Sequence, residues 1–160
     1  MDWWPSSLAD MPAIRQGLAA ALARGIDQCK VWPYFMDDPK PPALTVAGPE
    51  LTGFQTAFGD DASFLWIVEG CAQIGAGLAA AQQIFDEWVD PNGARSVNKA
   101  LLDDYRLNHR LDMEGNLTED VGPAADSVAL VEFRGYRRQH LPKSGVEVLL
   151  GDFAIQVETS

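Results

Sequence analysis

The chain has 160 residues, of which 47% are hydrophobic, and its formal net charge is −11. This length is typical of a single domain, which we expect to span residues 1–160. The composition argues against global disorder, and no apolar run approaches the ~18 residues that a membrane span needs. Because neutralising phosphates requires a surplus of Lys and Arg, the acidic balance excludes a general nucleic-acid binder.

The first residues do not resemble a secretory signal, because Met1–Pro5 contains neither a basic nor an apolar segment. Trp3 and Trp4 allow two interpretations. They fold back onto the chain's own core in the manner of a hydrophobic staple, or they dock on a neighbouring chain, since Trp is enriched at interface centres. Both remain open, and the two residues are candidate interface residues.

A helix is predicted first. Asp10 is a good N-cap, Pro12 suits the first turn, and Gly25 provides the end. Between them apolar residues recur at helical spacing. These are Ile14, Leu18, Ala21 and Leu22.

Three strands are predicted next. Two are short, Lys30–Phe35 and Ala43–Ala47, and a proline-rich loop containing Asp37 and Asp38 separates them. The third, Ser63–Cys71, is apolar on both faces, as expected of a central strand.

Two helices and a loop follow. An amphipathic pattern predicts a helix over Leu78–Val89, and Ser96 can cap a short helix over Val97–Asp103. Arg106–Pro123 is polar and predicts an exposed loop, with a short strand near Leu107–Leu111. Acidic residues recur along this loop. They are Asp112, Glu114, Glu119 and Asp120.

The last third of the chain predicts a long β-hairpin, with strands over Ser127–His140 and Val146–Val157. In the first strand the core-side pattern fades beyond Phe133. In the second strand Gly151 suggests a bulge, and four apolar residues share a face. These are Leu149, Phe153, Ile155 and Val157. We expect so long a hairpin to project from the core.

The predicted order is therefore α, β, β, β, α, α, β, β. It indicates an α+β fold: one mixed or antiparallel sheet with a long C-terminal β-hairpin, packed by two or three helices.

The hairpin tip is basic. Between Glu132 and Glu147 there are four basic residues and no acid. They are Arg134, Arg137, Arg138 and Lys143, and Tyr136 lies among them. The basic tip is either a solvated turn or a docking site for an acidic surface. The protein's own body is such a surface, because residues 1–125 hold 18 acids and 8 bases.

Sequence motifs for catalysis, cofactor binding or metal binding are weak. Gly75–Ala80 matches GxGxxA between a strand and a helix, but the acid-bearing strand that a dinucleotide site needs is missing. We interpret its small residues as letting the helix lie close to the sheet. His109 and His140 lie in no metal or catalytic motif, and Cys29 and Cys71 are expected to be free buried thiols. We expect no cofactor, no metal site and no enzymatic activity.

Several segments, taken in order, resemble the tail terminator (tail-completion) proteins of long-tailed siphoviruses that infect actinobacteria. The segments are Asp10–Ala19, Pro41–Gly48, Phe64–Val68, Ala94–Leu102 and Val128–Val157. The family has Pro-Pro-Ala before a short strand, a helix of Ser-Val-x-x-Ala-Leu type and a paired-strand ending. The resemblance covers most of the chain and rests on order and spacing. The Trp-Trp start is not a feature of this family, and the family has no catalytic residues.

The resemblance implies a structural virion protein, assembled in the host cytoplasm and located at the tail neck. It would form a six-fold ring that caps the head-proximal end of the tail tube, stops tube growth and presents the head-joining surface. Its partners would be copies of itself, the major tail tube protein, a head-completion or connector protein and the tape measure protein. DNA would pass through the bore without specific binding, and no membrane is involved.

Two surfaces follow as hypotheses. The basic tip would contact the next subunit or the tube ring below, because a closed ring needs two different patches that meet. Acids from the loops at Asp37 and Asp38 and at Asp112–Asp120 would line the bore and repel phosphate. The alternatives are another neck component, such as a head-completion or connector protein, a small cytosolic enzyme, or a non-viral adaptor of similar fold.

Overall fold

The computed structural model describes residues 11–34, 40–49, 55–56, 62–75, 77–109, 111, 116–117, 128–140 and 148–159. For 55–56, 62–64, 128–130, 132, 134–140 and 159 it describes the backbone alone. Within these residues the elements follow the predicted order, with one additional two-residue strand. They are α1 (Met11–Gly25), β1 (Lys30–Trp32), β2 (Ala43–Pro49), β3 (Gln55–Thr56), β4 (Ala62–Gln73), α2 (Leu78–Val89), α3 (Val97–Asp103), β5 (Val128–His140) and β6 (Val148–Thr159).

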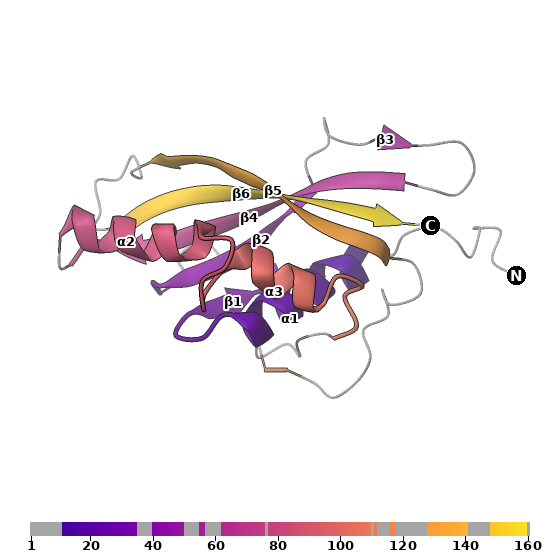
Figure 1. Ribbon diagram of the computed structural model, residues 1–160, viewed down its shortest axis with the longest axis horizontal. Coiled ribbons are helices and arrows are strands. Elements are labelled where there is room, and N and C mark those ends of the chain that lie inside the picture. Colours follow the sequence, from indigo (N-terminus) through magenta and orange to yellow (C-terminus); the bar gives the residue numbers. More distant parts are fainter. Residues whose placement is uncertain are drawn as a thin grey trace, which may run out of the picture.

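One sheet joins all the described strands in the order β1-β2-β4-β6-β5, and β3 pairs with the start of β4 (Figure 1). β1 and β2 are parallel, and every other pair is antiparallel. The sheet is therefore mixed, and the predicted α+β class is confirmed.

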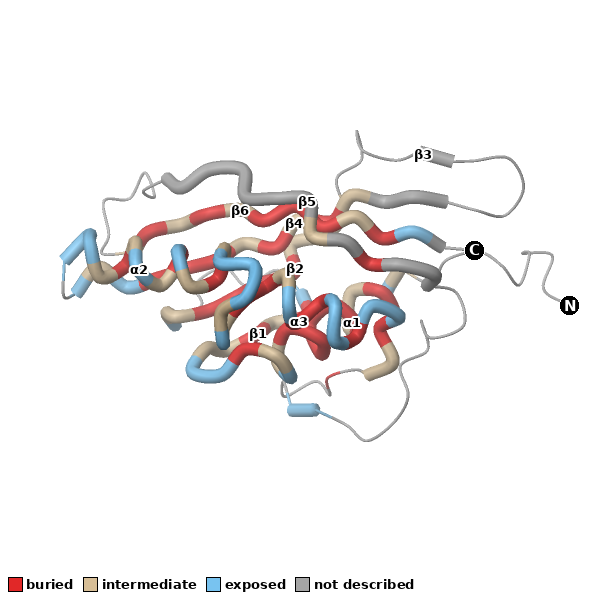
Figure 2. The backbone as a smooth tube through the Cα atoms, viewed as in Figure 1, coloured by how far each residue is buried: buried red, intermediate tan, exposed pale blue. Residues whose placement is uncertain are grey.

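The helices form a layer on one face of the sheet. α1 contacts β1 and β2, α3 contacts β5, and α2 contacts β4 and β6 (Figure 1). Side chains of β4 alternate accordingly: Trp66 and Val68 are fully buried under the helices, whereas Leu65 and Ile67 on the other face are half-buried. Figure 2 shows the buried residues concentrated in α1 and along β4 and β6.

α1 is the most deeply buried helix. Its predicted apolar positions are buried, and so is the run Ala19–Ala21 between them. Two glycines allow its neighbours to approach closely. A Cβ added at Gly17 would lie 2.8 Å from Leu107 Cβ, and one at Gly25 would lie 2.4 Å from Ala100 Cβ.

The segment after α3 differs from the prediction of an exposed loop. Leu107 and Leu111 are buried, and Leu111 forms an isolated β-bridge with Leu117. Leu107 fills the space above Gly17 and has a positive φ of 54°. The start of the polar stretch thus belongs to the core, and the strand expected over Leu107–Leu111 is reduced to that bridge.

An aromatic cluster attaches α2 to the sheet. Phe85 and Trp88 are in edge contact at 5.0 Å between ring centroids, and Phe85 stacks on Phe153 of β6 at 6.1 Å. The rings lie over Gly70 of β4, where an added Cβ would be 2.8 Å from Trp88.

The glycines of the GxGxxA match do not bring α2 close to the sheet, so that interpretation was wrong. Gly75 and Gly77 are exposed, and a Cβ at Gly77 would meet no atom within 4 Å. Gly77 instead has a φ of 109° at the N-cap, a conformation that favours glycine. The strands around the motif are antiparallel, unlike those of a dinucleotide-binding unit.

The predicted cap of α3 is confirmed. Ser96 has extended backbone geometry, and its hydroxyl accepts a hydrogen bond from the Lys99 amide at 3.1 Å.

The C-terminal hairpin forms, but the described strands do not project from the body. All twelve residues of β4 pair with β6, from Ala62 opposite Thr159 to Gln73 opposite Val148. Leu149, close to the tip, is buried in the core. The expectation of a free ribbon was wrong because β4 is longer than predicted and α2 covers its far end (Figure 1).

The irregularities of the hairpin lie in β5. Its register with β6 shifts at three points, leaving Ala129, Arg134 and Arg137 as the additional residues. Gly151 pairs regularly with both Gly70 and Gln139, so the bulge expected there was wrong. The four apolar residues predicted to share a face of β6 are all buried, as expected.

Candidate functional site

β5 is the edge strand of the sheet on the side of the hairpin. Within the described residues this 13-residue strand pairs with β6 alone, so its other side offers backbone amide and carbonyl groups (Figure 1). Edge strands can template pairing with another chain, and natural proteins protect them with bulges and charged residues. β5 has both, because Arg134 and Arg137 occupy two of its three bulges.

The predicted basic residues are thus partly located. The backbones of Arg134, Tyr136, Arg137 and Arg138 lie in β5, and their side chains are outside the described part. The other predicted site residues lie wholly outside the described residues. They are Trp3, Trp4, Asp37, Asp38, Asp112, Glu114, Glu119, Asp120 and Lys143.

Arg138 differs from the other arginines in its register. It stands opposite Asp152 of β6, and Asp152 stands opposite Glu69 of β4. Like charges on facing positions of adjacent strands are unfavourable, and a base beside them offsets that cost. The register gives Arg138 an acidic neighbour in its own chain, whereas Arg137 is the additional residue of a bulge.

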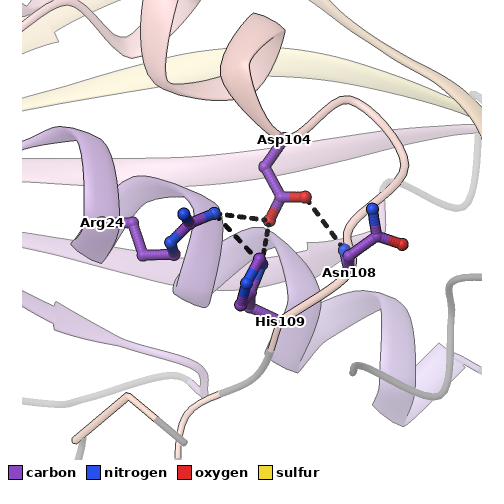
Figure 3. A network of polar contacts seen from close by, with 4 residues as sticks. All are labelled: Arg24, Asp104, Asn108 and His109. Carbon is purple, nitrogen blue, oxygen red and sulfur yellow. Dashed lines mark hydrogen bonds and ion pairs between the residues drawn. The ribbon is translucent and has the colours of Figure 1, made fainter. Parts of the chain in front are cut away.

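A buried carboxylate organises the segment after α3 (Figure 3). Asp104 is only 5% exposed. Its carboxylate accepts a hydrogen bond from the Asn108 amide at 3.0 Å, contacts His109 Nδ1 at 3.2 Å and lies 3.8 Å from the Arg24 guanidinium. The cluster joins α1 to the segment that buries Leu107.

Arg24 also lies 3.1 Å from His109 Nδ1, and these two contacts of the imidazole compete. Nδ1 can donate to Asp104 or accept from Arg24, but not both. Donation to Asp104 is favoured because this carboxylate is buried, whereas the Arg24 side chain is 43% exposed and can donate to water instead. Neither His109 nor Asp104 lines any of the three cavities described below. The cluster connects α1 to the segment after α3.

A second polar cluster surrounds Arg95, in the turn before α3. Its guanidinium donates to Glu87 at 2.8 Å, to Asp27 at 3.1 Å and to Gln28 at 2.5 Å. These bonds join α2 to the turn after α1, and they raise the pKa of Arg95. The cluster borders two open cavities of about 230 and 330 Å³.

Cys29 lines the smaller of these cavities. Burial, and secondarily the charge of Asp27, raises the pKa of the Cys29 thiol to about 11. Such a thiol is neutral near pH 7 and is a poor nucleophile or metal ligand. Neither Cys29 nor Cys71 is part of a disulfide, as expected, and Cys71 is buried whereas Cys29 is only half-buried.

A third cavity, of about 300 Å³, lies where the start of α1 meets the ends of β1 and β2. We call it the α1 groove, and Arg15 and Gln16 are its polar lining residues. Its apolar lining is Met11, Pro12, Pro33, Tyr34, Pro49 and Trp66. Sequence patterns gave no signal for it, because its walls come from segments far apart in the chain.

In the described part of the chain, no three metal-ligating side chains gather. None of the described helices has the combined length and apolarity that crossing a membrane requires.

Comparisons with known proteins add little. No protein-family model and no curated protein matches the chain. Among solved structures it is similar to a chain of the "Virion of native gene transfer agent (GTA) particle", with 13% sequence identity and a TM-score of 0.40. The alignment covers 89% of this chain and 83% of that chain.

Proposed function

We propose that this chain is a structural virion protein, a single tail-terminator-like domain over residues 1–160. Copies of it form a six-fold ring that caps the head-proximal end of a phage tail tube, stops tube polymerisation and provides the head-joining surface. The ring sits at the tail neck and contacts the tail tube protein, a head-completion or connector protein and the tape measure protein. We propose no catalytic residue and no cofactor.

The observation that best supports this proposal is the open edge at β5. The family resemblance implies a closed ring, in which one patch of each protomer contacts a different patch of the next protomer. A 13-residue edge strand with Arg134, Arg137 and Arg138 along it is a suitable first patch. It lies on a protein whose net charge is −11, so copies offer it acidic partners.

The bulges favour contact through side chains over addition of a strand. A continuing sheet needs a regular row of amide and carbonyl groups, and three register shifts interrupt that row in β5. The ring contact therefore relies on the arginines, with Arg137 the main contributor and Arg138 shared with Asp152.

The end of α2 is a suitable second patch. The last turn of α2 has no basic residue, and three acids lie in it or next to it: Asp86, Glu87 and Asp90. Asp27 is linked to this turn because Arg95 forms ion pairs with both Asp27 and Glu87. Acids at a helix C-terminus face the negative end of the helix dipole. Arg95 already pairs with Glu87 and Asp27, so a cation from another subunit would act chiefly on Asp86 and Asp90.

The test is charge reversal at β5. R137E/R138E should reduce ring formation and tube capping at least tenfold, measured by sedimentation and by the length of the tubes in electron micrographs. The matched control is K40E/K99E, which makes the same charge change at two exposed positions. Normal capping by R137E/R138E, or equal loss in the control, would contradict the proposal.

A second-site reversal tests the acceptor patch. D86K/D90K should impair assembly alone and should restore it when combined with R137E/R138E. The single variants separate the two arginines: R137E should affect assembly more, and R138E should affect the stability of the monomer more. If the combined variant folds but does not assemble, the acidic patch that accepts the β5 arginines lies elsewhere.

The bore-lining role of Asp37, Asp38, Asp112, Glu114, Glu119 and Asp120 remains part of the proposal. Their charge would repel DNA phosphates over the screening length of ~8 Å at physiological salt. Another neck component, such as a head-completion or connector protein, is the second candidate. Binding to the portal instead of the tube would favour it.

A further inference from the structure

The α1 groove has the features of an occupied site. Its volume of about 300 Å³ stands at the lower end of the ~300–1,000 Å³ typical of ligand pockets. Prolines and aromatic rings form most of its wall, and Tyr34 at its rim is 43% exposed. Such a lining suits a large, flat side chain.

Arg15 gives the groove a positive charge that favours an anionic occupant. Its guanidinium donates to the backbone carbonyl oxygens of Pro33 and Val46 and lies 5.4 Å from the ring centroid of Trp66. Burial lowers the pKa of Arg15, and none of the described residues offers it a carboxylate. A half-buried cation of this kind is stabilised by an incoming carboxylate.

The indole N–H of Trp66 is a second polar group in the groove that would be stabilised by a partner. Trp66 lines the groove, is fully buried, and its indole N–H finds no hydrogen-bond acceptor among the residues that the structure describes. Buried donors are normally paired, so a missing acceptor indicates a group not yet accounted for.

The chain has a segment with the matching groups. Asp2-Trp3-Trp4 places one carboxylate next to two indoles, and the chain re-enters the described structure at Met11, in the wall of the groove. The seven steps from Trp4 to Met11 reach at most ~25 Å when extended. A tether this short gives its own groove an effective concentration in the millimolar range, which favours binding within one chain.

We propose that Asp2-Trp3-Trp4 docks in the α1 groove of its own chain, with an indole against Tyr34 and the prolines and the Asp2 carboxylate at Arg15. The N-terminal segment is then a plug that completes the protomer, and it does not bridge subunits. This inference does not depend on the tail-terminator role.

Photo-cross-linking tests the proposal. A benzophenone amino acid replaces Tyr34 in a mixture of ¹⁴N- and ¹⁵N-labelled full-length chains, and mass spectrometry identifies the linked peptides. We expect links to residues 1–10 within single-isotope chains. Mixed-isotope links would show exchange between subunits, and an absence of links to residues 1–10 would show that the groove has another occupant; either result would overturn the proposal. The matched control is the same probe at Tyr105, which is 48% exposed and lies outside the groove.

A second measurement does not depend on the probe. In protein labelled with 5-fluorotryptophan, the ¹⁹F resonances of Trp3 and Trp4 are assigned with W3F and W4F. Y34A should shift at least one of them, and D2N should produce a smaller shift. Unchanged resonances in a folded Y34A protein would contradict docking in the groove.

Discussion

Asp104 shows how one buried charge positions a loop. It contacts a backbone amide, an imidazole and a guanidinium (Figure 3), and the segment that it holds places Leu107 over Gly17. Removing such an acceptor leaves buried donors without a partner, at a cost of ~1–3 kcal/mol each.

D104A should therefore lower the free energy of unfolding by about 2 kcal/mol, measured by urea denaturation. D104N should cost less, because its side-chain carbonyl can still accept from the Asn108 amide. D103A is the control: Asp103 is exposed, and surface changes usually stay within ~0.5 kcal/mol. Equal midpoints for D104A and D103A would show that the cluster does not hold the loop.

Cys29 gives a pH-dependent prediction. With its pKa at about 11 in place of 9.0, the thiolate of the folded protein is roughly 100-fold scarcer near neutral pH. In C71A protein, iodoacetamide should label Cys29 slowly at pH 8, and the rate should rise about tenfold per pH unit until pH ~11. D27N should move this profile to lower pH, because the charge of Asp27 raises the pKa. A rate that levels off near pH 9 would contradict the assignment.

The same shift makes stability depend on pH. The unfolded thiol loses its proton near pH 9.0 and the folded thiol near pH 11, so the unfolded state binds fewer protons between these values. The stability that the protonated Cys29 thiol contributes to the folded state is complete below pH 9.0 and is lost as the pH rises towards 11. C29A should lack this part of the alkaline loss of stability.

At the scale of the elements, the contact between α2 and the sheet depends on Gly70. An added methyl group would meet Trp88 at 2.8 Å and the rings of Phe85 and Phe153 at 3.1 Å. Rings held by one another cannot move independently, so G70A should cost ~1–3 kcal/mol of unfolding free energy. G75A is the control, because Gly75 is exposed and its nearest neighbour is the Gln73 side chain at 3.4 Å. Equal thermal midpoints for the two variants would contradict this packing.

Elements set by local rules could be predicted from the sequence. Helical spacing located α1 and α2, a single hydroxyl at Ser96 located the start of α3, and strict alternation located β6. Each of these signals depends on residues within one or two turns or pleats of one another.

Features set by distant contacts could not be predicted. The bulge at Arg134 shifts the register of β5, so Tyr136 stands opposite Phe153, a position that strict alternation from Phe133 would give to Gly135. Gly17 gives Leu107 its space from 90 residues away along the chain. The basic residues of β5 were visible in the sequence, whereas the α1 groove needs α1, β1, β2 and β4 together.

At the scale of the whole molecule, the hairpin is an integral part of the sheet. β6 is a central strand, so β5 carries the open edge of the hairpin, and β1 is the edge strand at the other end of the sheet. An assembly contact at β5 thus connects directly to the core of the protomer. We propose that this edge joins copies of the protein into a closed ring on a tail tube.

Mass measurement of the purified protein, alone and after incubation with preformed tubes of the cognate tail protein, tests that claim most directly. With tubes present, mass photometry of the released caps should show a species of six protomers, and the tubes should stop elongating. A monomer before tubes are added is compatible with the account, since a ring can form on its template. A protein that stays monomeric with tubes, while the tubes continue to elongate, would contradict it.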